Sequence, residues 1–284
     1  MHGKSIFALP LLWLAACGGG AEKGAPATAR SAPSTPPVVT IVAKDFAFEA
    51  PDTIHAGMTT LKLVNEGPNL HHVQLVRLRE GRSYEEFLAA LKEMKPGMAP
   101  PAWIIDVAGP NSPLPGGESS LTQELQPGTY ALTCFIDTPD HVPHIAKGMV
   151  KPLTILPNNM PSAAAPTADI TVTMSDYAWE ITPALSAGKH VIRIENAASQ
   201  PHEMFIMQLA PGKTAEDVMK WGQTYEGPPP GKPMGGISGM ATGQVGYLPV
   251  DLPAGEYLLV CFLPDAKDGQ PHLAHGMIKQ LTVS

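Results

Sequence analysis

A duplicated set of four residue types places the strongest constraint on how this chain can fold. The segment CFIDTPDHVPHIAKGM, residues 134–149, returns as CFLPDAKDGQPHLAHGM, residues 261–277. Each segment follows a stretch that contains an upstream histidine, His71 in the first case and His202 in the second. A cysteine or a methionine could recur for packing reasons alone. Four residue types that recur in the same order indicate two related domains, each with its own site.

A nearly constant difference in residue number traces the duplication through the rest of the chain. The segment DFAFE at residues 45–49 matches DYAWE at 176–180, a difference of 131 that also relates His71 to His202. The difference falls to 127 for the two cysteines and becomes 128 for the histidine and methionine that follow them. A difference that changes only between motifs is typical of duplicated domains that have gained or lost residues in loops.

The length and composition fit two compact β domains. At 284 residues the chain is long enough for two domains of ordinary size, which we expect at 38–156 and 168–284, with a linker at 157–167. Its 27 glycines and 31 prolines are numerous enough to interrupt helices and to favour short strands joined by turns. The sequence therefore predicts an all-β fold of two β-sandwiches in tandem. Short β-branched runs predict strands at 40–42, 61–64, 73–76, 170–172, 190–194 and 257–260.

One short helix is expected to interrupt each copy. A capping-box pattern, Ser-x-x-Glu at residues 83–86, precedes apolar residues with the spacing of one helix face. Thr-x-x-Asp at 214–217 repeats this start signal in the second copy. The stretches behind these helices, 95–117 and 226–243, are rich in Gly, Pro and Met, and we expect them to be surface loops.

The first residues indicate an export signal rather than folded protein. A positively charged start precedes an apolar run at 6–14 that is too short to span a bilayer. LAACG at 14–18 resembles the lipobox of bacterial lipoproteins, which implies acylation of Cys17; the alternative is an ordinary secretory signal with a chance cysteine. We therefore expect a signal over 1–17 and a flexible tether over 18–37. The protein would be an exported, membrane-anchored bacterial lipoprotein that faces the periplasm or the cell exterior.

Charge and cysteine content narrow the expected partners and bonds. The net charge of −7, without a run of Lys and Arg, argues against nucleic acid and is compatible with a basic partner. Besides Cys17 the chain has only Cys134 and Cys261. A disulfide is the usual expectation in an exported protein, but here it would have to join equivalent positions of two domains within about 7 Å. We therefore expect each thiol to be buried, unpaired, in its own domain.

The four repeated residue types are the ligand types of a blue-copper site. Two imidazoles, one thiolate and a weak axial thioether hold copper in a trigonal arrangement that is used for electron transfer. We therefore predict one copper ion in each domain. The predicted ligands are His71, Cys134, His144 and Met149 in the first copy and His202, Cys261, His272 and Met277 in the second.

The remaining histidines and loop methionines lie outside this common pattern. His72 neighbours a predicted ligand, His141 has no clear counterpart, and His275 aligns with Lys147. We expect these three histidines to face solvent or to support the ligands. Copper scavenging is an alternative use for the loop methionines, although methionine in a loop more often serves packing. These methionines are Met98, Met234 and Met240.

Each copy resembles the cupredoxins, the plastocyanin/azurin superfamily of Greek-key β-sandwiches that bind type 1 copper. The resemblance rests on Asn65 and Asn196, each six residues before the first histidine, and on the His-x4-Met spacing with glycine before methionine. It covers most of 38–284 and implies the Greek-key fold, copper and the ligands given above. The segment between cysteine and second histidine departs from plastocyanin, with nine and ten residues here. Copper nitrite reductases of the same superfamily also have a long segment there.

The sequence argues against an enzyme. Nitrite reductases and multicopper oxidases place a histidine directly before the type 1 cysteine, where this chain has Thr133 and Val260. No His-x-His pair occurs, and no Ser/His/Asp arrangement is expected. The sequence therefore predicts a membrane-tethered copper protein that transfers electrons in the cell envelope. Two alternatives are Cu(I) storage or delivery with the same ligands, and a metal-free cupredoxin-like interaction domain.

Overall fold

The computed structural model describes residues 2–3, 35–94, 98, 100–224 and 228–284. By its internal contacts the chain divides into Met1–Arg30 and Ser31–Ser284. Cys17, most of the predicted signal and the tether up to residue 34 lie outside the described residues, so acylation stays a prediction. Within the described part of the chain, no helix has the length and apolar character needed to cross a membrane.

Strands form most of both copies. The elements of the first copy are β1 (Val38–Lys44), β2 (Ala47–Glu49), β3 (Thr53–His55), β4 (Gly57–Asn65), β5 (Gln74–Leu78), α1 (Tyr84–Glu93), β6 (Ile104–Asp106), β7 (Glu118–Leu125), β8 (Gly128–Thr133), the 3-10 helix η1 (His144–Lys147) and β9 (Val150–Leu156). Those of the second are β10 (Ile170–Ser175), β11 (Ala178–Thr182), β12 (Gly188–Asn196), β13 (His202–Leu209), α2 (Ala215–Thr224), β14 (Gly231–Met240), β15 (Val245–Leu252), β16 (Gly255–Val260), the 3-10 helix η2 (His272–His275) and β17 (Ile278–Val283).

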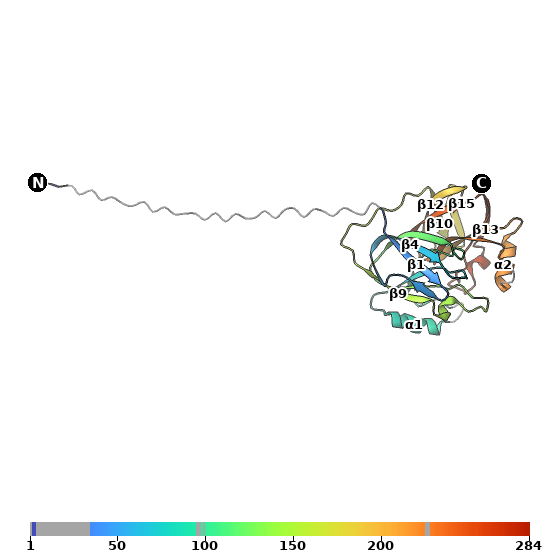
Figure 1. Ribbon diagram of the computed structural model, residues 1–284, viewed down its shortest axis with the longest axis horizontal. Coiled ribbons are helices and arrows are strands. Elements are labelled where there is room, and N and C mark those ends of the chain that lie inside the picture. Colours follow the sequence, from blue (N-terminus) through green and yellow to red (C-terminus); the bar gives the residue numbers. More distant parts are fainter. Residues whose placement is uncertain (1, 4–34, 95–97, 99, 225–227) are drawn as a thin grey trace. The chain divides into compact units, whose positions relative to one another are not determined.

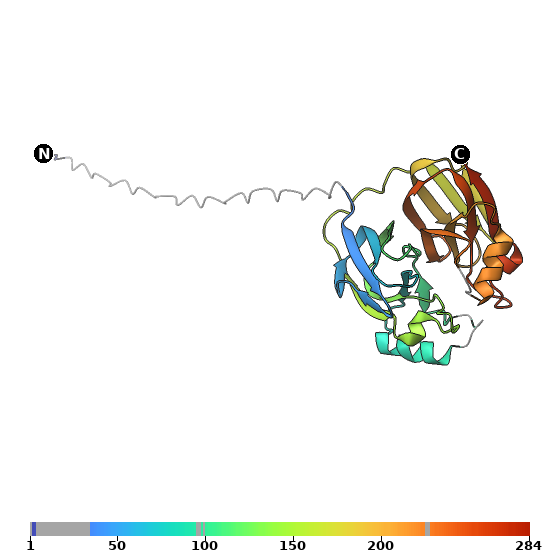
Figure 2. The same cartoon turned by 45° about the vertical axis from the view of Figure 1, so that its right-hand side comes forward.

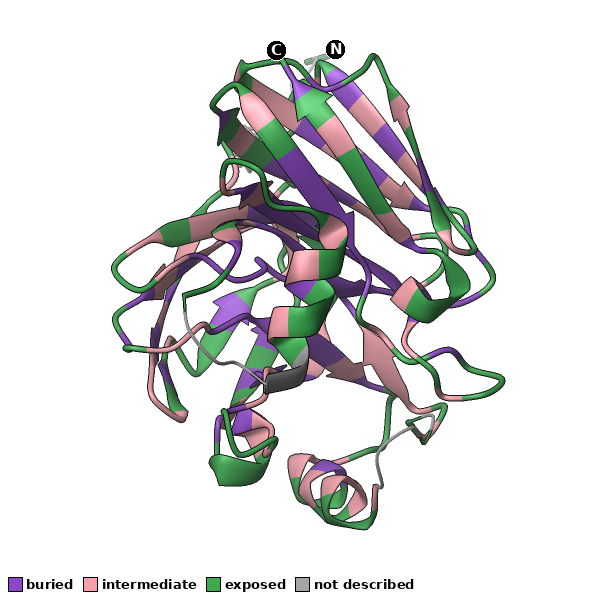
Figure 3. Ribbon diagram, turned by 90° about the vertical axis from the view of Figure 1, so that its right-hand side faces the viewer, coloured by how far each residue is buried: buried purple, intermediate pink, exposed green. Residues whose placement is uncertain are grey.

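Two sheets enclose an apolar core in each copy. In the first, β2-β1-β4-β7 lies against β3-β9-β8-β5-β6, and in the second, β11-β10-β12-β15 lies against β14-β13-β16-β17. Buried and less buried side chains alternate along strands such as β4, as one buried sheet face requires (Figure 3). Buried residues of both sheets share one cluster per copy, for example Ile192 of β12 with Ile206 of β13. The predicted all-β fold of two sandwiches is confirmed.

The two predicted α-helices are also confirmed. The hydroxyl of Ser83 accepts a hydrogen bond from the N–H of Glu86 (3.2 Å), and the Glu86 carboxylate accepts one from the N–H of Ser83 (2.8 Å). Thr214 and Asp217 make the same reciprocal contacts before α2. Figures 1 and 2 show each helix on the outside of its own copy. The helices therefore lie on the outside of the sandwiches, and neither interrupts a sheet.

The two copies share one sheet and a second antiparallel contact. Strand β7 pairs with β15, which joins the outer sheets of both copies into the order β11-β10-β12-β15-β7-β4-β1-β2. The segment 107–113 of the first copy also runs antiparallel to β14, and we call this second contact the seam. Its bridged pairs are Val107 with Met240, Pro110 with Ile237 and Pro113 with Met234.

The seam has approximate two-fold symmetry. Adding 127, the difference between the two cysteines, to 107, 110 and 113 gives 234, 237 and 240. Exchange of the copies therefore maps the set of bridged pairs onto itself, as in the isologous interface of a symmetric dimer. The chain folds like a dimer whose two subunits have been joined.

Glycines let each seam segment approach other backbone of its own copy closely. A Cβ atom on Gly109 would lie 2.1 Å from the carbonyl oxygen of Val73, and one on Gly236 would lie 1.9 Å from that of Met204. The pair Gly109–Val73 in the first copy is equivalent to the pair Gly236–Met204 in the second. A side chain at either glycine would collide with backbone. The prediction that 95–117 and 226–243 are surface loops is wrong for 107–113, which is buried at the seam, and for 231–240, which forms β14.

The predicted linker, residues 157–167, lies along the first copy. The hydroxyl of Ser162 accepts a hydrogen bond from the N–H of Met58 (2.7 Å) and donates one to Glu124 (3.1 Å). The side-chain amide of Asn158 donates to the carbonyl of Ala56 (3.1 Å). A segment with the composition of a flexible tether is thus held in place by specific hydrogen bonds.

Candidate metal centres

The first copy brings one cysteine and two histidines together in its core. The ligand atoms of His71, Cys134 and His144 all lie within 4.8 Å of one another. Nδ1 of His71 is 3.1 Å from Nδ1 of His144, and the sulfur of Cys134 is 3.5 Å from the latter nitrogen. All three side chains are essentially buried. His71 and His144, which are 73 positions apart in the sequence, thus form a compact cluster with Cys134 that offers three potential ligand atoms.

The second copy repeats this cluster with His202, Cys261 and His272. Nδ1 of His202 is 2.9 Å from Nδ1 of His272, and the sulfur of Cys261 is 3.9 Å and 3.2 Å from these two nitrogens. All three residues are buried, and the thiols of Cys134 and Cys261 are free. Each thiol lies in its own copy, as predicted for unpaired cysteines.

Each methionine is anchored next to its cysteine by the backbone. The N–H of Cys134 donates to the carbonyl of Met149 (3.3 Å), and the N–H of Met149 donates to the carbonyl of His144 (3.0 Å). Gly148 ends η1 with a left-handed φ of 103°, which returns the chain toward the core. Met149 and Met277 are fully buried in the same apolar clusters as their cysteines. The second copy makes these contacts through Cys261, His272, Gly276 and Met277.

The long segments between cysteine and second histidine leave the cluster intact. In the first copy Asp137 forms a bridge with Pro143, and the N–H of His144 donates to the carbonyl of Ile136 (2.9 Å). The residues between these contacts form a loop that is closed at its base. The number of residues in the loop therefore does not determine where the histidine lies. The second copy has the same contacts, between Pro264 and Pro271 and between His272 and Leu263.

One aspartate holds the first histidine of each cluster. Nε2 of His71 lies 3.0 Å from a carboxylate oxygen of Asp45, and Nε2 of His202 lies 3.0 Å from Asp176. A carboxylate that accepts the outer N–H of an imidazole orients the ring and strengthens it as a metal ligand. Neither aspartate was among the residues predicted from the sequence to form or support the sites. Asp45 and Asp176 nevertheless begin the duplicated DFAFE and DYAWE segments, which was a usable signal.

The same contacts fix where the ring protons lie in the metal-free protein. Because a carboxylate only accepts hydrogen bonds, His71 carries its proton on Nε2, and its Nδ1 is an acceptor. The facing Nδ1 of His144 must then donate, which leaves Nε2 of His144 as a buried atom without a hydrogen-bond partner among the described residues. Nε2 of His272 is in the same position. A metal ion bound by both Nδ1 atoms of a cluster would require the second histidine, His144 or His272, to carry its proton on Nε2 instead.

Protonation and ligand type fit copper. Burial lowers the pKa of His144 and of His272 to about 4, so both rings are neutral at pH 7. Burial raises the pKa of Cys134 to about 12 and also raises that of Cys261, so each thiol keeps its proton until a metal displaces it. Structural zinc takes four strong ligands, whereas each described cluster offers three. A thiolate, two imidazoles and a neighbouring thioether are the ligands that blue copper takes.

The residues that follow the first histidines support the thiols. His72 and Glu203 are equivalent and both are buried, and each accepts the N–H of the phenylalanine after the cysteine, at 2.9 Å and 2.7 Å. The N–H of Glu203 also donates to the sulfur of Cys261 (3.4 Å). Burial lowers the pKa of His72 to about 3 and raises that of Glu203 to about 7. His72 thus supports the cysteine as a neutral ring, which is one of the two roles expected for it.

The other singled-out residues lie away from the clusters or pack in the core. His141 is exposed, and His275 lies at the surface 3.2 Å from Asp268. Asp268, His275 and the buried Asp265 also lie within 4.8 Å of one another. Met240 is buried in the core of the second copy with Met234 packed against it, while Met98 is exposed. The described methionines thus give little support to a scavenging surface.

A serine, a histidine and an aspartate lie in line at the start of β12, where no such arrangement was expected. Nδ1 of His190 is 2.5 Å from Asp169, and Nε2 is 3.2 Å from the hydroxyl of Ser186. Nε2 is also 2.9 Å from the carbonyl oxygen of Ser186, which can only accept. Both contacts and the pKa that Asp169 raises favour the protonated ring, which is a poor acceptor for the serine proton.

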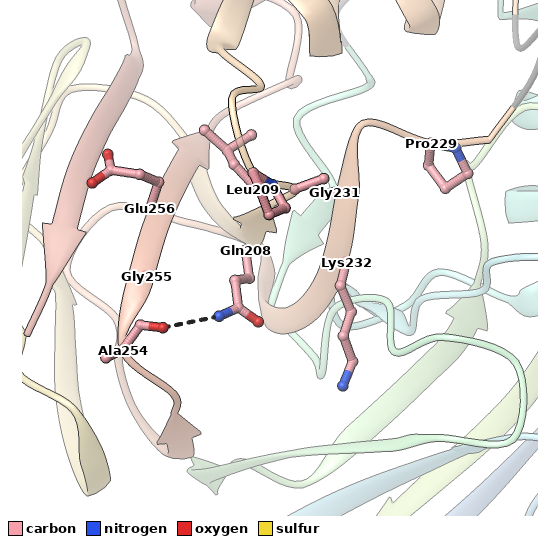
Figure 4. Close-up of a pocket in the computed structure, with 10 residues that line it drawn as sticks. Gln208, Leu209, Pro229, Gly231, Lys232, Ala254, Gly255 and Glu256 are labelled. Carbon is pink, nitrogen blue, oxygen red and sulfur yellow. Dashed lines mark hydrogen bonds between the residues drawn. The ribbon is translucent and has the colours of Figure 1, made fainter.

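A surface cavity of about 560 Å³ lies at the other end of the second copy. It is lined by Leu209 at the end of β13 and Gly255 at the start of β16 (Figure 4). The candidate ligands His202 and Cys261 lie at the opposite ends of these two strands. The side-chain amide of Gln208 donates to the carbonyl of Ala254 (3.4 Å). The cavity is therefore separate from the candidate centre.

Comparisons with known proteins give matches only among solved structures. A scan against protein-family models and a search of curated proteins find no match. Dithionite-reduced auracyanin from Roseiflexus castenholzii is 23% identical, with a TM-score of 0.28, over 44% of this chain and 100% of that protein. A blue copper oxidase from Nitrosomonas europaea is 17% identical, with a TM-score of 0.26, over 88% and 86%. Copper nitrite reductase from the same organism is 14% identical, with a TM-score of 0.24, over 88% and 94%. At these TM-scores the interpretation rests on the chain's own residues.

Proposed function

We propose that this protein binds two copper ions and carries electrons in the cell envelope. The observation that supports this most strongly is the pair of buried clusters, in which one cysteine and two histidines converge before any metal is bound. Copper held by such ligands changes between Cu(I) and Cu(II) with little rearrangement. The chain's own part is to hold the ligands rigidly, through the Asp45 and Asp176 contacts and the backbone bonds that join Cys134 to Met149 and Cys261 to Met277.

The proposal assigns no catalytic centre to the chain. Thr133 and Val260 stand where oxidases and nitrite reductases of this superfamily have a histidine, and the Thr133 hydroxyl donates to the carbonyl of Gln74 (2.8 Å). The pattern that would relay electrons from a blue-copper cysteine to a second copper is therefore replaced by structural contacts. We propose a redox protein as the partner, because a carrier must exchange electrons with a second protein.

Storage or delivery of Cu(I) is the second candidate function. It is favoured by the burial of the second histidine in each cluster, since His144 is 1% exposed and His272 is 0% exposed. An imidazole edge that does not reach the surface slows the exchange of electrons with a partner and protects bound Cu(I). Reversible reduction and reoxidation of an intensely coloured Cu(II) form would support the carrier. Tight Cu(I) binding without that colour would support storage, and failure of both copies to bind copper would leave a metal-free interaction domain.

The membrane anchor is a separate part of the proposal. The sequence LAACG at 14–18 supports lipid attachment at Cys17, which would place the copper domains at the periplasmic or external face of a membrane. Replacing Cys17 by alanine removes the only residue that this attachment can use. We expect the variant to appear in the soluble fraction after cell disruption, while the parent sediments with membranes. Equal sedimentation of both would contradict the anchor without affecting the copper sites.

A further inference from the structure

The two candidate centres differ at one position beside the second histidine. Thr138 and Asp265 each stand four residues after the cysteine. Each donates its backbone N–H across the base of the loop, Thr138 to Val142 (3.0 Å) and Asp265 to Gln270 (2.7 Å). The two residues are therefore structurally equivalent, but Thr138 carries a hydroxyl group and Asp265 carries a carboxyl group. Asp265 is 3% exposed.

Asp265 is oriented by hydrogen bonds toward His272. Its Oδ2 accepts from the hydroxyl of Tyr177 (2.5 Å) and from the amide of Gln200 (2.8 Å), and its Oδ1 accepts from the N–H of Lys267 (2.8 Å). Three hydrogen bonds donated to its oxygens favour the ionised form of this carboxyl. Oδ2 also lies 3.9 Å from Nε2 of His272, the buried atom that has no hydrogen-bond partner. That distance exceeds the length of a normal hydrogen bond by less than about 1 Å.

The first copy has no such carboxylate next to His144. Phe46 takes the place of Tyr177, with its ring centroid 5.2 Å from that of His144, and has no hydroxyl to orient an acid. Thr138 donates its hydroxyl to Asp140 and to the carbonyl of Val142. Among the described residues, Nε2 of His144 therefore has no acceptor. Lys147 instead holds its ammonium group 5.5 Å from the centre of the Phe46 ring and adds positive charge nearby.

This difference matters once both Nδ1 atoms of a cluster face a metal, because the second histidine must then carry its proton on Nε2. In the second copy Asp265 can accept that N–H, whereas the described residues of the first copy offer no acceptor. A carboxylate behind an imidazole makes the ring a stronger ligand, and its negative charge favours the more highly charged metal ion. We propose that Asp265 makes the second centre favour Cu(II) over Cu(I), so that the two centres have unequal reduction potentials. This inference rests on the proposed copper function.

The test compares reduction potentials in the full-length, copper-loaded protein and its variants by optical spectroelectrochemistry. The parent is expected to show two potentials, and Asp265→Thr should raise only the lower one. Loss of an outer hydrogen-bond partner changes metal affinity about 10- to 100-fold. If the change falls on Cu(II), a tenfold loss raises a one-electron potential by about 59 mV. Asp265→Asn, which keeps the side-chain shape, repeats the measurement if the threonine variant folds poorly.

The control is Asp268→Asn, which removes a nearby exposed carboxylate that lies against His275. We expect it to shift the lower potential much less than Asp265→Asn does. The reverse exchange, Phe46→Tyr with Thr138→Asp, should lower the higher potential. A single shared potential in the parent, or equal shifts from Asp265→Asn and Asp268→Asn, would overturn the inference and leave the copper function standing. Absence of copper binding in the parent would overturn both.

Discussion

Asp45 lies 3.0 Å from Nε2 of His71, although the two residues are 26 positions apart in the sequence. The contact fixes the ring so that Nδ1 points at the cysteine and the second histidine. We expect Asp45→Asn to weaken copper binding at the first centre by about 10- to 100-fold. Because Asp176 makes the same contact with His202 at 3.0 Å, Asp176→Asn should affect only the second centre. Competition with a copper chelator measures both, and equal loss at both centres from either variant would contradict the assignment.

Copper binding should release one proton from each centre. Burial raises the pKa of Cys134 to about 12 and raises that of Cys261, while the second histidines, with a pKa of about 4, have no proton to lose at neutral pH. The apparent affinity for Cu(II) should therefore rise about tenfold for each pH unit between about pH 6 and 9. Calorimetric titration in buffers of different ionisation enthalpy counts the protons. A value near zero would show that the cysteines are not ligands.

The seam should not tolerate a methyl group at Gly109. A Cβ there would lie 2.1 Å from the carbonyl oxygen of Val73, so Gly109→Ala must displace backbone. We expect a loss of about 1–3 kcal/mol in the free energy of unfolding. Gly222 in α2 is the matched control, because a Cβ there meets no atom within 4 Å. Gly222→Ala should be neutral or stabilising by up to about 1 kcal/mol. Equal effects of both substitutions in urea unfolding would disprove close packing at Gly109.

The contribution of Glu203 to the stability of the metal-free protein should fall as the pH rises. Its folded pKa of about 7 lies above the ordinary 4.5, so the folded state holds the proton more tightly than the unfolded state. The resulting stability is present below about pH 4.5 and is lost as the pH rises through 7, on the order of 3 kcal/mol. Urea unfolding at pH 5 and pH 8 measures the change.

Buried histidines act in the opposite direction, because burial lowers the pKa of His72 to about 3 and those of His144 and His272 to about 4. The contribution of Glu203 is therefore the difference between the parent and Glu203→Gln. Between pH 5 and pH 8 the change in the free energy of unfolding should be more favourable in the variant by about 2–3 kcal/mol. If parent and variant change by the same amount, Glu203 is not the group responsible.

The duplication in the sequence predicted the fold and the convergence of ligands better than it predicted their surroundings. The two-sandwich fold and the grouping of one cysteine with two histidines follow from residues that recur in both copies. Asp45 and Asp176 recur as well, but only the folded chain shows that they reach His71 and His202. Asp265 could not be found from the repeat, because its equivalent is Thr138.

Composition was least informative at the contact between the copies. Gly109 and Gly236 looked like loop residues, yet each lies in a seam segment and packs against a backbone carbonyl of its own copy. A glycine needed for close approach cannot be distinguished in sequence from one needed for a turn. The symmetry of the seam was visible only when residue pairs from both copies were known.

Copper titration of the full-length protein with optical and paramagnetic resonance spectra tests the central claim most directly. The account predicts two copper ions per chain, each with the intense absorption of a copper–thiolate bond. Cys134→Ser should leave one such ion, and Cys261→Ser should leave the other. Weak binding of Cu(II) with tetragonal spectra that do not change in either cysteine variant would contradict the account.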